Sequence, residues 1–356
     1  MSMAVEFYPL RVRSVDPLTD DAVAVTFEVP SHLTDEFRYL PGQHVTIRAE
    51  IDGADVRRSY SICANANRGN LRVGIKRLEG GAFSTWATSK LAPGDLLEVM
   101  PPVGEFTIQP DPMARHHYAA IVAGSGITPV LSLVATTLES EPDSRWTLIY
   151  GNRGANSIMF LDEVEGLKDR YPDRIHLIHV LSREQPDLDL YAGRIDADKL
   201  ERFFGSVIDF DSVDSWYLCG PFEMVTEARK LIEGRGVEPE RVHDELFFAG
   251  PVDPAAIVPP ETIEGSVELR VTLGGRATVT RMDPEMSVLD AAIRVRSELP
   301  FSCKGGMCAT CKARVIEGEV TMDKNYALVD SEVAAGYVLT CQSHPVGDRL
   351  VVDYDV

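Results

Sequence analysis

The chain has 356 residues, of which 44% are hydrophobic and 25% charged, and its formal net charge at pH 7 is −20. This length exceeds what one ordinary hydrophobic core needs, so we expect a globular protein of two or three domains. The negative charge argues against a nucleic-acid partner, whose phosphates it would repel. No apolar run is long enough to span a bilayer, and the N-terminus lacks the pattern of a signal peptide. We therefore expect a cytoplasmic protein that binds neither nucleic acid nor a membrane.

Residues 5–110 are predicted to form an antiparallel β-barrel. Short runs rich in β-branched residues, such as 22–30 (AVAVTFEVP), 44–51 (HVTIRAEI) and 71–78 (LRVGIKRL), alternate with turns of Gly, Pro, Asn and Asp. Closely spaced strands of this kind favour a small barrel. A proline-rich stretch at 101–115 then indicates a connector.

One predicted strand ends in Arg58, Ser59, Tyr60 and Ser61. Side chains alternate along a strand, so Arg58 and Tyr60 project to the same side, where a guanidinium can pair with a diphosphate and a phenol ring can lie along a flavin. The four residues match the R-x-Y-S motif of the ferredoxin–NADP reductase superfamily, which the first two segments resemble throughout. That resemblance implies that Ser61 offers its hydroxyl to the flavin N5 atom. On residue type alone, Tyr60 fits ordinary barrel packing as well.

The stretch 75–88 (IKRLEGGAFSTWAT) matches the G-x-x-S segment of the same superfamily at a predicted helix start. Glycines followed by free amides at a helix N-terminus form an anion site, which we interpret as the cradle for the FAD diphosphate. FAD is favoured over FMN because the diphosphate site is complete, although some relatives with this domain order bind FMN, which stays open. For Lys76, a solvated side chain is favoured over one that adds charge to the site. The residues assigned to the cradle are Lys76, Gly81, Ala82, Phe83 and Ser84.

Residues 115–248 have a different pattern, in which apolar strands such as 118–124 and 145–152 alternate with helical stretches such as 129–140 and 159–171. Strands that alternate with helices indicate βαβ units. This segment is therefore predicted to be an α/β domain with a parallel sheet.

The turn IVAGSGITPVLS at 121–132 follows one of these strands. Gly124 and Gly126 permit a tight turn, Thr128 is a candidate N-cap, and Pro129 suits the first helical turn. The pattern departs from the dinucleotide fingerprint G-x-G-x-x-G. It matches the G-x-G-x-T-P motif of the superfamily, and the resemblance implies that its amides face the diphosphate of NAD(P).

Arg153, Ser182 and Arg183 follow the ends of two predicted strands. An NAD site often places a carboxylate at such a position, where it binds the ribose hydroxyls. Cationic and hydroxyl side chains suit the 2′-phosphate of NADPH better. Glu184 adjoins them and could serve a 2′-hydroxyl, so NADH stays open as the alternative.

Cys219, Gly220 and Pro221 match the C-G-P motif of the superfamily at a strand end. The resemblance implies that Cys219 stands beside the nicotinamide and helps to aim its C4 atom at N5, without acting as a nucleophile. A buried, inert thiol is the alternative. Where relatives carry an acidic residue and an aromatic ring near the flavin, this chain has Glu245, a candidate proton relay, and Phe247, a candidate ring neighbour.

The stretch 249–266 holds four prolines and few bulky residues, which indicates an extended interdomain linker. Residues 267–356 mix strands with one predicted helix at 287–298. This third segment resembles a plant-type ferredoxin domain over its whole length, which implies an α+β fold of the β-grasp type. We therefore predict a multidomain chain in which barrel, α/β and β-grasp domains follow each other.

Three cysteines of the third segment have the spacing C-x4-C-x2-C, and a fourth follows alone, far downstream. This is the arrangement that holds a plant-type [2Fe–2S] cluster, in which each iron takes two thiolates. A structural zinc site is the alternative, although zinc sites usually show two C-x2–4-C pairs. The predicted ligands are Cys303, Cys308, Cys311 and Cys341.

The domain order resembles that of reductase components of multicomponent bacterial oxygenases. Residues 150–174 and the stretches HVLSRE and VHDELF are most similar to the reductase subunits of phenylacetyl-CoA epoxidases, which serve phenylacetate degradation. That resemblance implies electron flow from NADPH to FAD, to [2Fe–2S] and on to a di-iron oxygenase. Reductases of the 3-ketosteroid 9α-hydroxylases, whose acceptor is a Rieske oxygenase, are the second choice. Because no predicted residue contacts the final substrate, the acceptor rests on analogy.

Two hypotheses lie outside this class. One is an iron–sulfur redox sensor without enzymatic flux, which has no need of a complete nucleotide domain. The other is a zinc-stabilised flavoprotein that passes electrons directly to a small molecule such as a quinone. A visible spectrum separates the second hypothesis from the reductase, because only the reductase adds iron–sulfur absorption to that of the flavin.

Overall fold

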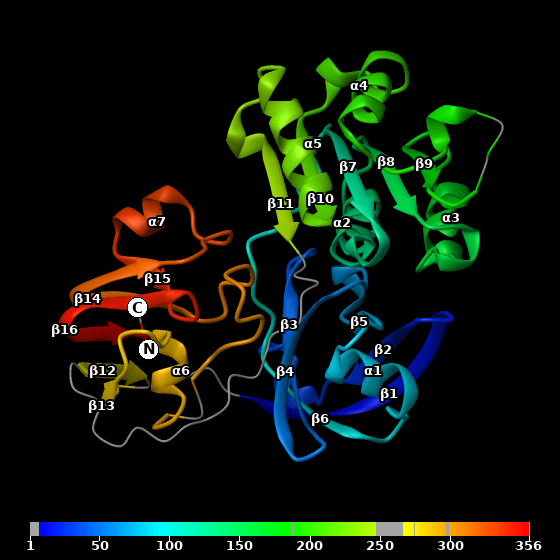
Figure 1. Ribbon diagram of the computed structural model, residues 1–356. Coiled ribbons are helices and arrows are strands. Elements are labelled where there is room, and N and C mark those ends of the chain that lie inside the picture. The colour runs from blue at the N-terminus through cyan, green and yellow to red at the C-terminus, as the bar shows by residue number, and fades with distance from the viewer. Residues whose placement is uncertain are drawn as a thin grey trace. The chain divides into compact units, whose positions relative to one another are not determined.

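The computed structural model describes residues 7–184, 186, 188–246, 266–273, 275–296 and 299–355 (Figure 1). These residues fall into two compact units. The larger consists mainly of described residues up to 246, and the smaller mainly of those from 266 onward. The linker predicted at 249–266 lies outside the described residues apart from Ser266. No helix in the described ranges is long and apolar enough to cross a membrane.

The first part of the larger unit is a six-stranded sheet with the strand order β4-β3-β6-β1-β2-β5, and the pairs β1–β2, β2–β5 and β3–β6 are antiparallel. An antiparallel bridge between Ile62, just after β4, and Val73 in β5 joins the two ends of that order, which closes the sheet into the predicted barrel. Its strands are β1 (Tyr8–Thr19), β2 (Ala22–Glu28), β3 (His44–Ile51), β4 (Ala54–Ser61), β5 (Leu71–Lys76) and β6 (Leu96–Val99). The short helix α1 (Ala82–Ser89) follows β5.

The second part of the larger unit is a five-stranded parallel sheet with the order β11-β10-β7-β8-β9, as predicted. Its strands are β7 (His117–Ala123), β8 (Arg145–Asn152), β9 (Ile175–Leu181), β10 (Ser215–Gly220) and β11 (Val242–Leu246). The helices between them are α2 (Ile127–Ser140), α3 (Leu161–Arg170), α4 (Ala197–Ser206) and α5 (Phe222–Gly234) (Figure 1). The boundaries predicted at 110 and 115 stay predictions, because the barrel and this sheet lie in one compact unit.

Strand β7 is buried on both faces, as the central strand of a parallel sheet should be. Its residues Ala120 and Val122 pack into the core that includes buried residues of α2 and α3. Ala119 and Ile121 point the other way, into the core formed with α4 and α5. The alternation of a strand thus assigns successive residues to opposite helical layers.

The chain adds β8 and β9 on one side of β7 and then returns to add β10 and β11 on the other side. The order therefore reverses between β7 and β10, which end at Ala123 and Gly220. In open α/β sheets, ligands bind outside the carboxyl ends of the strands at such a reversal. This is where the two predicted nucleotide motifs meet.

The smaller unit is a five-stranded mixed sheet with the order β13-β12-β16-β14-β15, in which β12 and β16 are parallel. Helix α6 (Val288–Ala292) packs Val288, Ala291 and Ala292 into the core of this sheet, as in a β-grasp fold. The strands are β12 (Val267–Leu273), β13 (Arg276–Met282), β14 (Lys312–Met322), β15 (Tyr337–Leu339) and β16 (Ser343–Asp353), and a second short helix is α7 (Asp330–Ala334).

The helix predicted over 287–298 is shorter than expected. Ser287 is its N-cap, and its hydroxyl accepts a hydrogen bond from the Asp290 amide. Helix α6 ends at Ala292, and Val295 then donates to the Ala292 carbonyl, a tighter bond than that of an α-helix. The β-branched residues Ile293 and Val295 lower the helix propensity at this point.

Candidate functional site

The three residues predicted to be catalytic meet in the larger unit. Ser61, the last residue of β4, donates a hydrogen bond of 2.8 Å from its hydroxyl to Oε2 of Glu245 in β11. Cys219 of β10 lies directly opposite Glu245 in the parallel pairing of the two strands. The fold therefore places a hydroxyl, a carboxylate and a thiol together beside the strand-order reversal.

The surroundings of Cys219 determine the protonation state of its thiol. Cys219 is fully buried, and its pKa is raised, first by burial and then by the carboxylates of Glu245 and Asp244. A thiol with a raised pKa stays protonated and is a poor nucleophile. This agrees with the prediction that Cys219 does not act as a nucleophile, and the role of Glu245 as a proton relay stays a prediction.

Strand β4 also carries the other residues of the R-x-Y-S motif. Arg58, Ser59 and Tyr60 are half-buried, and Nη1 of Arg58 donates to the Arg57 carbonyl at 2.7 Å. The ring of Tyr60 lies 5.5 Å from that of Phe83, which is buried at the start of α1. This contact joins the motif strand to the predicted cradle.

The predicted cradle does begin a helix. Gly80 adopts φ +72°, in the left-handed region that favours glycine, and Gly81 is the N-cap of α1. The hydroxyl of Ser84 accepts from the Leu78 amide at 3.1 Å and donates to the Gly81 carbonyl at 3.3 Å, which fixes the turn. The first amides of a helix have no intrahelical acceptor, and its dipole favours an anion there. A diphosphate fits these donors.

Lys76, the fifth residue assigned to the diphosphate site, already has a partner within the protein. Its Nζ atom lies 3.6 Å from Oδ1 of Asp21 in a half-buried ion pair. Part of its charge is therefore balanced within the protein, and its role in binding the cofactor stays a prediction.

The nucleotide turn packs against the end of β10. Gly124 adopts φ +56°, and a Cβ atom at Gly126 would lie 2.2 Å from the Cys219 carbonyl oxygen. The prediction of Thr128 as the N-cap is wrong. The N-cap of α2 is Gly126, and Thr128 lies inside the first turn, where its hydroxyl donates to the Ser125 carbonyl at 2.9 Å. The turn continues into α2 through a short 3-10 helix, so the cap falls two residues earlier. Pro129 lies in the first turn, as expected.

The candidate 2′-phosphate residues form one surface at the ends of β8 and β9. Backbone hydrogen bonds join Ser182 to Asn152 at 2.9 Å and Arg183 to Arg153 at 2.8 Å, so both loops run side by side. Both arginines are exposed. The Glu184 carboxylate accepts the Ala155 amide at 2.6 Å, so it is engaged by the neighbouring loop.

Gly220 and Pro221, the other two residues of the C-G-P motif, lie at the end of β10. Gly220 ends the strand, and a Cβ atom there would lie 2.7 Å from Cε of Met224. Pro221 is the N-cap of α5. Phe247 lies outside the described residues, so its assignment as a ring neighbour stays a prediction.

The four cysteines of the smaller unit contact each other in pairs. The pKa of Cys303 is lowered to about 5, first by a hydrogen bond from Cys308 and against the effect of burial, and that of Cys341 is lowered by Cys311. The amide of Gly305 points at Sγ of Cys303 from 3.3 Å. Among the described residues, no three or more His, Cys, Asp or Glu side chains surround a single metal position.

This donor set fits a two-iron cluster. Each iron of a [2Fe–2S] centre takes two cysteine thiolates, and the two thiol pairs supply them. The loop also brings an amide to sulfur, as an anionic sulfur core requires. Gly306 supports the close wrapping of the loop, because it adopts φ +78° and a Cβ atom there would lie 2.9 Å from the Lys324 carbonyl oxygen.

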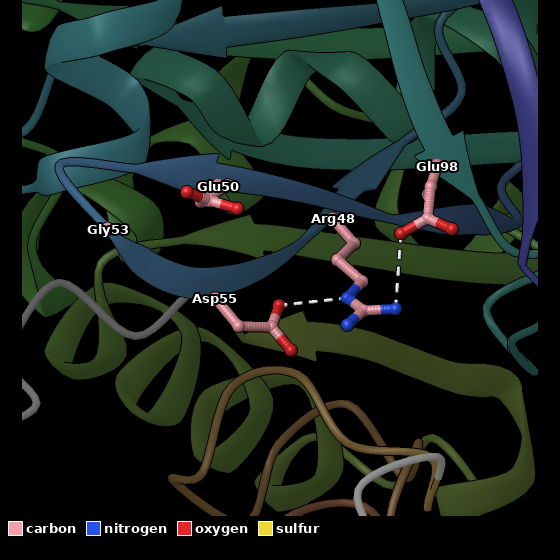
Figure 2. Close-up of a pocket in the computed structure, with 5 residues that line it drawn as sticks. All are labelled: Arg48, Glu50, Gly53, Asp55 and Glu98. Atoms are coloured by element: carbon pink, nitrogen blue, oxygen red, sulfur yellow. Dashed lines mark hydrogen bonds and ion pairs between the residues drawn. The ribbon is translucent and has the colours of Figure 1, made fainter.

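A pocket of about 260 Å³ lies on the barrel, apart from the predicted site (Figure 2). Arg48 spans it, with Nε 3.0 Å from Asp55 and Nη1 3.1 Å from Glu98. Glu50 and Gly53 complete its lining, and none of the predicted site residues takes part. The single positive charge of Arg48 is shared between the carboxylates of Asp55 and Glu98, and no residue predicted for the redox site lies among them.

One residue near the site was not predicted. His44, at the start of β3, has its Nδ1 atom 3.6 Å from Oε1 of Glu245. The only signal in the sequence is its position directly after the turn Pro41-Gly42-Gln43, which resembles the barrel of the superfamily but fits a plain turn equally well.

Three family models match the chain: the oxidoreductase FAD-binding domain over 9–108, the oxidoreductase NAD-binding domain over 120–230, and the 2Fe–2S iron–sulfur cluster binding domain over 271–346. Fold and site thus define an oxidoreductase with FAD-binding, NAD-binding and 2Fe–2S domains. Phthalate dioxygenase reductase shares this fold, with a TM-score of 0.58 at 22% identity over 98% of both chains.

Two curated relatives cover nearly the whole chain. A component of the 1,2-phenylacetyl-CoA epoxidase from Escherichia coli strain K12 is 43% identical over 98% of both chains. The ferredoxin reductase component of 3-ketosteroid-9-alpha-monooxygenase from Rhodococcus rhodochrous is 31% identical over 97% of this chain and 96% of its own. The chain belongs to this family of reductase components of oxygenase systems, with the 1,2-phenylacetyl-CoA epoxidase component among its members. The predictions of an oxidoreductase and of its three cofactor-binding domains are confirmed.

Proposed function

We propose that this chain takes electrons from NADPH and delivers them, through FAD and a [2Fe–2S] cluster, to the oxygenase subunits of a phenylacetyl-CoA epoxidase. The observation that carries the electron path is the meeting of Ser61, Cys219 and Glu245 where the strand order reverses. The identity of 43% along the whole chain supports the acceptor. A Rieske oxygenase is the second candidate, supported by the 31% identity to the ketosteroid reductase.

The residues divide the work of binding. Arg58 and the first amides of α1 would hold the FAD diphosphate, and Tyr60 would lie along the flavin ring. When bound, FAD supplies the conversion between a two-electron hydride donor and a one-electron acceptor. Ser61 would hold a hydroxyl at the ring, with Glu245 behind it as a proton acceptor. Cys303, Cys308, Cys311 and Cys341 would ligate the cluster.

NADPH is favoured over NADH by the surface at the ends of β8 and β9. Arg153 and Arg183 are exposed there, and the carboxylate of Glu184, which would suit a ribose hydroxyl, is engaged by the Ala155 amide. A guanidinium pairs well with a phosphate. The double variant Arg153→Gln/Arg183→Gln should raise KM for NADPH about tenfold or more and change KM for NADH by less than about threefold. Steady-state ferricyanide reduction measures both.

Arg115→Gln is the matched control, because Arg115 is an exposed arginine paired with Asp143 away from this surface. It should leave both KM values unchanged. An equal loss of NADPH and NADH binding in the double variant would show that the arginines do not read the 2′-phosphate.

The electron path is tested by paramagnetic resonance. Protein reconstituted anaerobically with FAD, iron and sulfide should show the signal of a reduced [2Fe–2S] cluster after NADPH is added. Flavin reduction without a cluster signal would overturn the path. Purified di-iron epoxidase subunits and a Rieske oxygenase are then offered in turn. Phenylacetyl-CoA-dependent NADPH consumption with the first alone supports the proposed acceptor, and turnover with the second alone contradicts it.

We also propose a cytoplasmic location, which is where a phenylacetyl-CoA oxygenase would meet its NADPH and thioester substrates. The family match over 271–346 to a 2Fe–2S domain disfavours the zinc-stabilised flavoprotein. The redox sensor is disfavoured because the FAD- and NAD-binding domains are both present.

A further inference from the structure

The buried ring of His44 lies behind Glu245, on the side away from Ser61. The two carboxylate oxygens face different partners: Oε2 accepts from the Ser61 hydroxyl at 2.8 Å, and Oε1 lies 3.6 Å from Nδ1 of His44. The side chains of His44 and Glu245 are only 7% and 15% exposed. Within the described residues, no other basic side chain lies within ion-pair distance of Glu245.

The imidazole ring is fixed in place by its surroundings. The backbone of His44 exchanges two hydrogen bonds of 2.9 Å with Val103. Gly104 leaves room for the ring, since a Cβ atom there would lie 3.0 Å from Nδ1. Any larger residue at position 104 would crowd the imidazole ring, so the glycine allows the ring to lie beside Glu245.

The burial of the His44 ring indicates which of its two nitrogens carries the proton in the neutral form. Nε2 is buried and has no hydrogen-bond partner among the described residues. A proton on Nε2 would be a buried donor without an acceptor, which is costly. In the neutral ring the proton therefore belongs on Nδ1, which faces the carboxylate. His44 is then a donor directed at Oε1 of Glu245.

The proposed function creates a need for this donor. A hydride from NADPH brings two electrons and one proton, whereas the cluster accepts electrons only, one at a time. Once both electrons have left, one proton per NADPH remains to be removed from the flavin site. Ser61 can pass it to Glu245, and the carboxylate works in this role only if Oε2 stays aimed at the hydroxyl.

We propose that His44 is a positioning residue for this proton transfer, which rests on the proposed function. Its Nδ1–H, 3.6 Å from Oε1 of Glu245, attracts that oxygen electrostatically, so that Oε2 stays directed at Ser61. With FAD and the cluster bound, the Ser61 hydroxyl would receive the proton released from the flavin and give its own proton to Glu245, while the two electrons would leave one at a time to the cluster. His44 takes no part in the arrival of the hydride.

Two variants of His44 distinguish the effect of its N–H donor from the effect of its side-chain volume. His44→Asn keeps an N–H near the position of Nδ1, and His44→Leu fills the space without a donor. Stopped-flow absorbance of the FAD- and cluster-loaded protein follows flavin reduction by NADPH and then flavin reoxidation by the cluster, in H₂O and in D₂O. We expect His44→Leu to slow the reoxidation phase about tenfold or more and to raise its solvent isotope effect, while flavin reduction changes by less than about threefold. His44→Asn should restore most of the reoxidation rate.

A readout without turnover comes from the FAD-free protein. Nitrogen NMR of the labelled His44 ring should show the proton on Nδ1, and Glu245→Gln should shift that resonance, because the partner of Nδ1 changes. Thermal melting of each variant checks folding. His32→Leu, at an exposed histidine of the 3-10 helix Ser31–Leu33, should match the parent protein in every measurement.

Three results would overturn the proposal: reoxidation in His44→Leu at the parent rate, a His44→Asn variant as slow as His44→Leu, or a ring proton on Nε2. Failure of the proposed function looks different. In that case, the parent protein itself would show no electron transfer from NADPH to the cluster.

Discussion

Gly126 illustrates what a single residue contributes to the nucleotide site. Its backbone dihedrals are ordinary helical ones, with φ −61° and ψ −10°, so the position does not need glycine for its conformation. It needs glycine for space, because the backbone of β10 passes where a Cβ atom would stand. The close approach brings the amides of the turn next to the strand that carries Cys219.

Gly126→Ala should therefore lower the free energy of unfolding by about 1–3 kcal/mol, because the backbone must shift to admit the methyl group. The shift should also weaken NADP⁺ binding. The matched control is Gly166→Ala in α3, where a Cβ atom meets nothing within 4 Å; this change should stabilise by about 0.5–1 kcal/mol, since alanine suits a helix better. Urea unfolding with and without NADP⁺ measures both effects. An unchanged stability of Gly126→Ala would contradict the close approach.

The elements position the site through the parallel sheet. Strand β7 ends at the nucleotide turn, and its first residue, His117, ties it to its surroundings: Nε2 contacts the Thr147 hydroxyl of β8 at 2.9 Å and Nδ1 contacts the Ser212 hydroxyl at 2.8 Å. The pKa of His117 is lowered from its ordinary 6.5 to about 4, first by burial and then by Arg145. Other charged groups that act on it are Asp214 and Asp209, which raise its pKa, and His176, which lowers it.

This histidine predicts a pH-dependent loss of stability. Between pH 6.5 and about 4 the unfolded chain binds a proton at His117 that the folded chain does not, so the free energy of unfolding falls as the pH is lowered through that window. Below about pH 4 both states are protonated and the contribution is constant. In His117→Gln the difference in stability between pH 7.5 and pH 5 should be smaller than in the parent protein, as measured by denaturant unfolding.

The exposed His32 supplies the control for this titration. His32→Gln should keep the parent's difference between the two pH values. If His117→Gln kept it as well, the buried neutral state of His117 would not be a source of the acid sensitivity.

On the scale of the whole molecule, the chain combines a flavin and nucleotide unit with a separate iron–sulfur unit. Each unit has its own hydrophobic core, and α6 covers the sheet of the smaller unit. Loss of the cluster should therefore leave the flavin chemistry of the larger unit in place. The two activities can be separated by changing a single cysteine.

Cys308→Ser should remove the cluster and leave FAD binding intact. Ferricyanide reduction by NADPH, which needs the flavin alone, should stay within about twofold of the parent value, whereas transfer to the oxygenase should fall by about a hundredfold or more. Iron content, the visible spectrum and both activities are measured together. Cys63→Ser, at a buried thiol of the larger unit, should keep the cluster and serves as the control. Full oxygenase activity without iron would contradict the electron path.

Short patterns in the sequence were sufficient to predict most helices and strands and the cofactors that the chain binds. The spacing of the cysteines, the glycines before α1 and α2, and the alternation of strands with helices are short-range signals, because each depends on the backbone of a few neighbouring residues. They predicted the barrel and the parallel sheet, whereas the β-grasp fold followed from the resemblance to plant-type ferredoxins. Even here the cap of α2 and the length of α6 were wrong, since packing and turn geometry decide where a helix begins and ends.

Only the tertiary structure brought together residues that lie far apart along the chain. Ser61 and Glu245 are separated by 184 positions, and they meet because the barrel closes and β11 is added beside β10. His44 carried no strong motif, and its place behind Glu245 depends on the glycine at 104 and on the same strand order. Strand order is set by the burial of whole faces against each other, which no short stretch of sequence encodes. For that reason the sequence alone indicated the cofactor chemistry, and the fold decided which side chains lie together at the site.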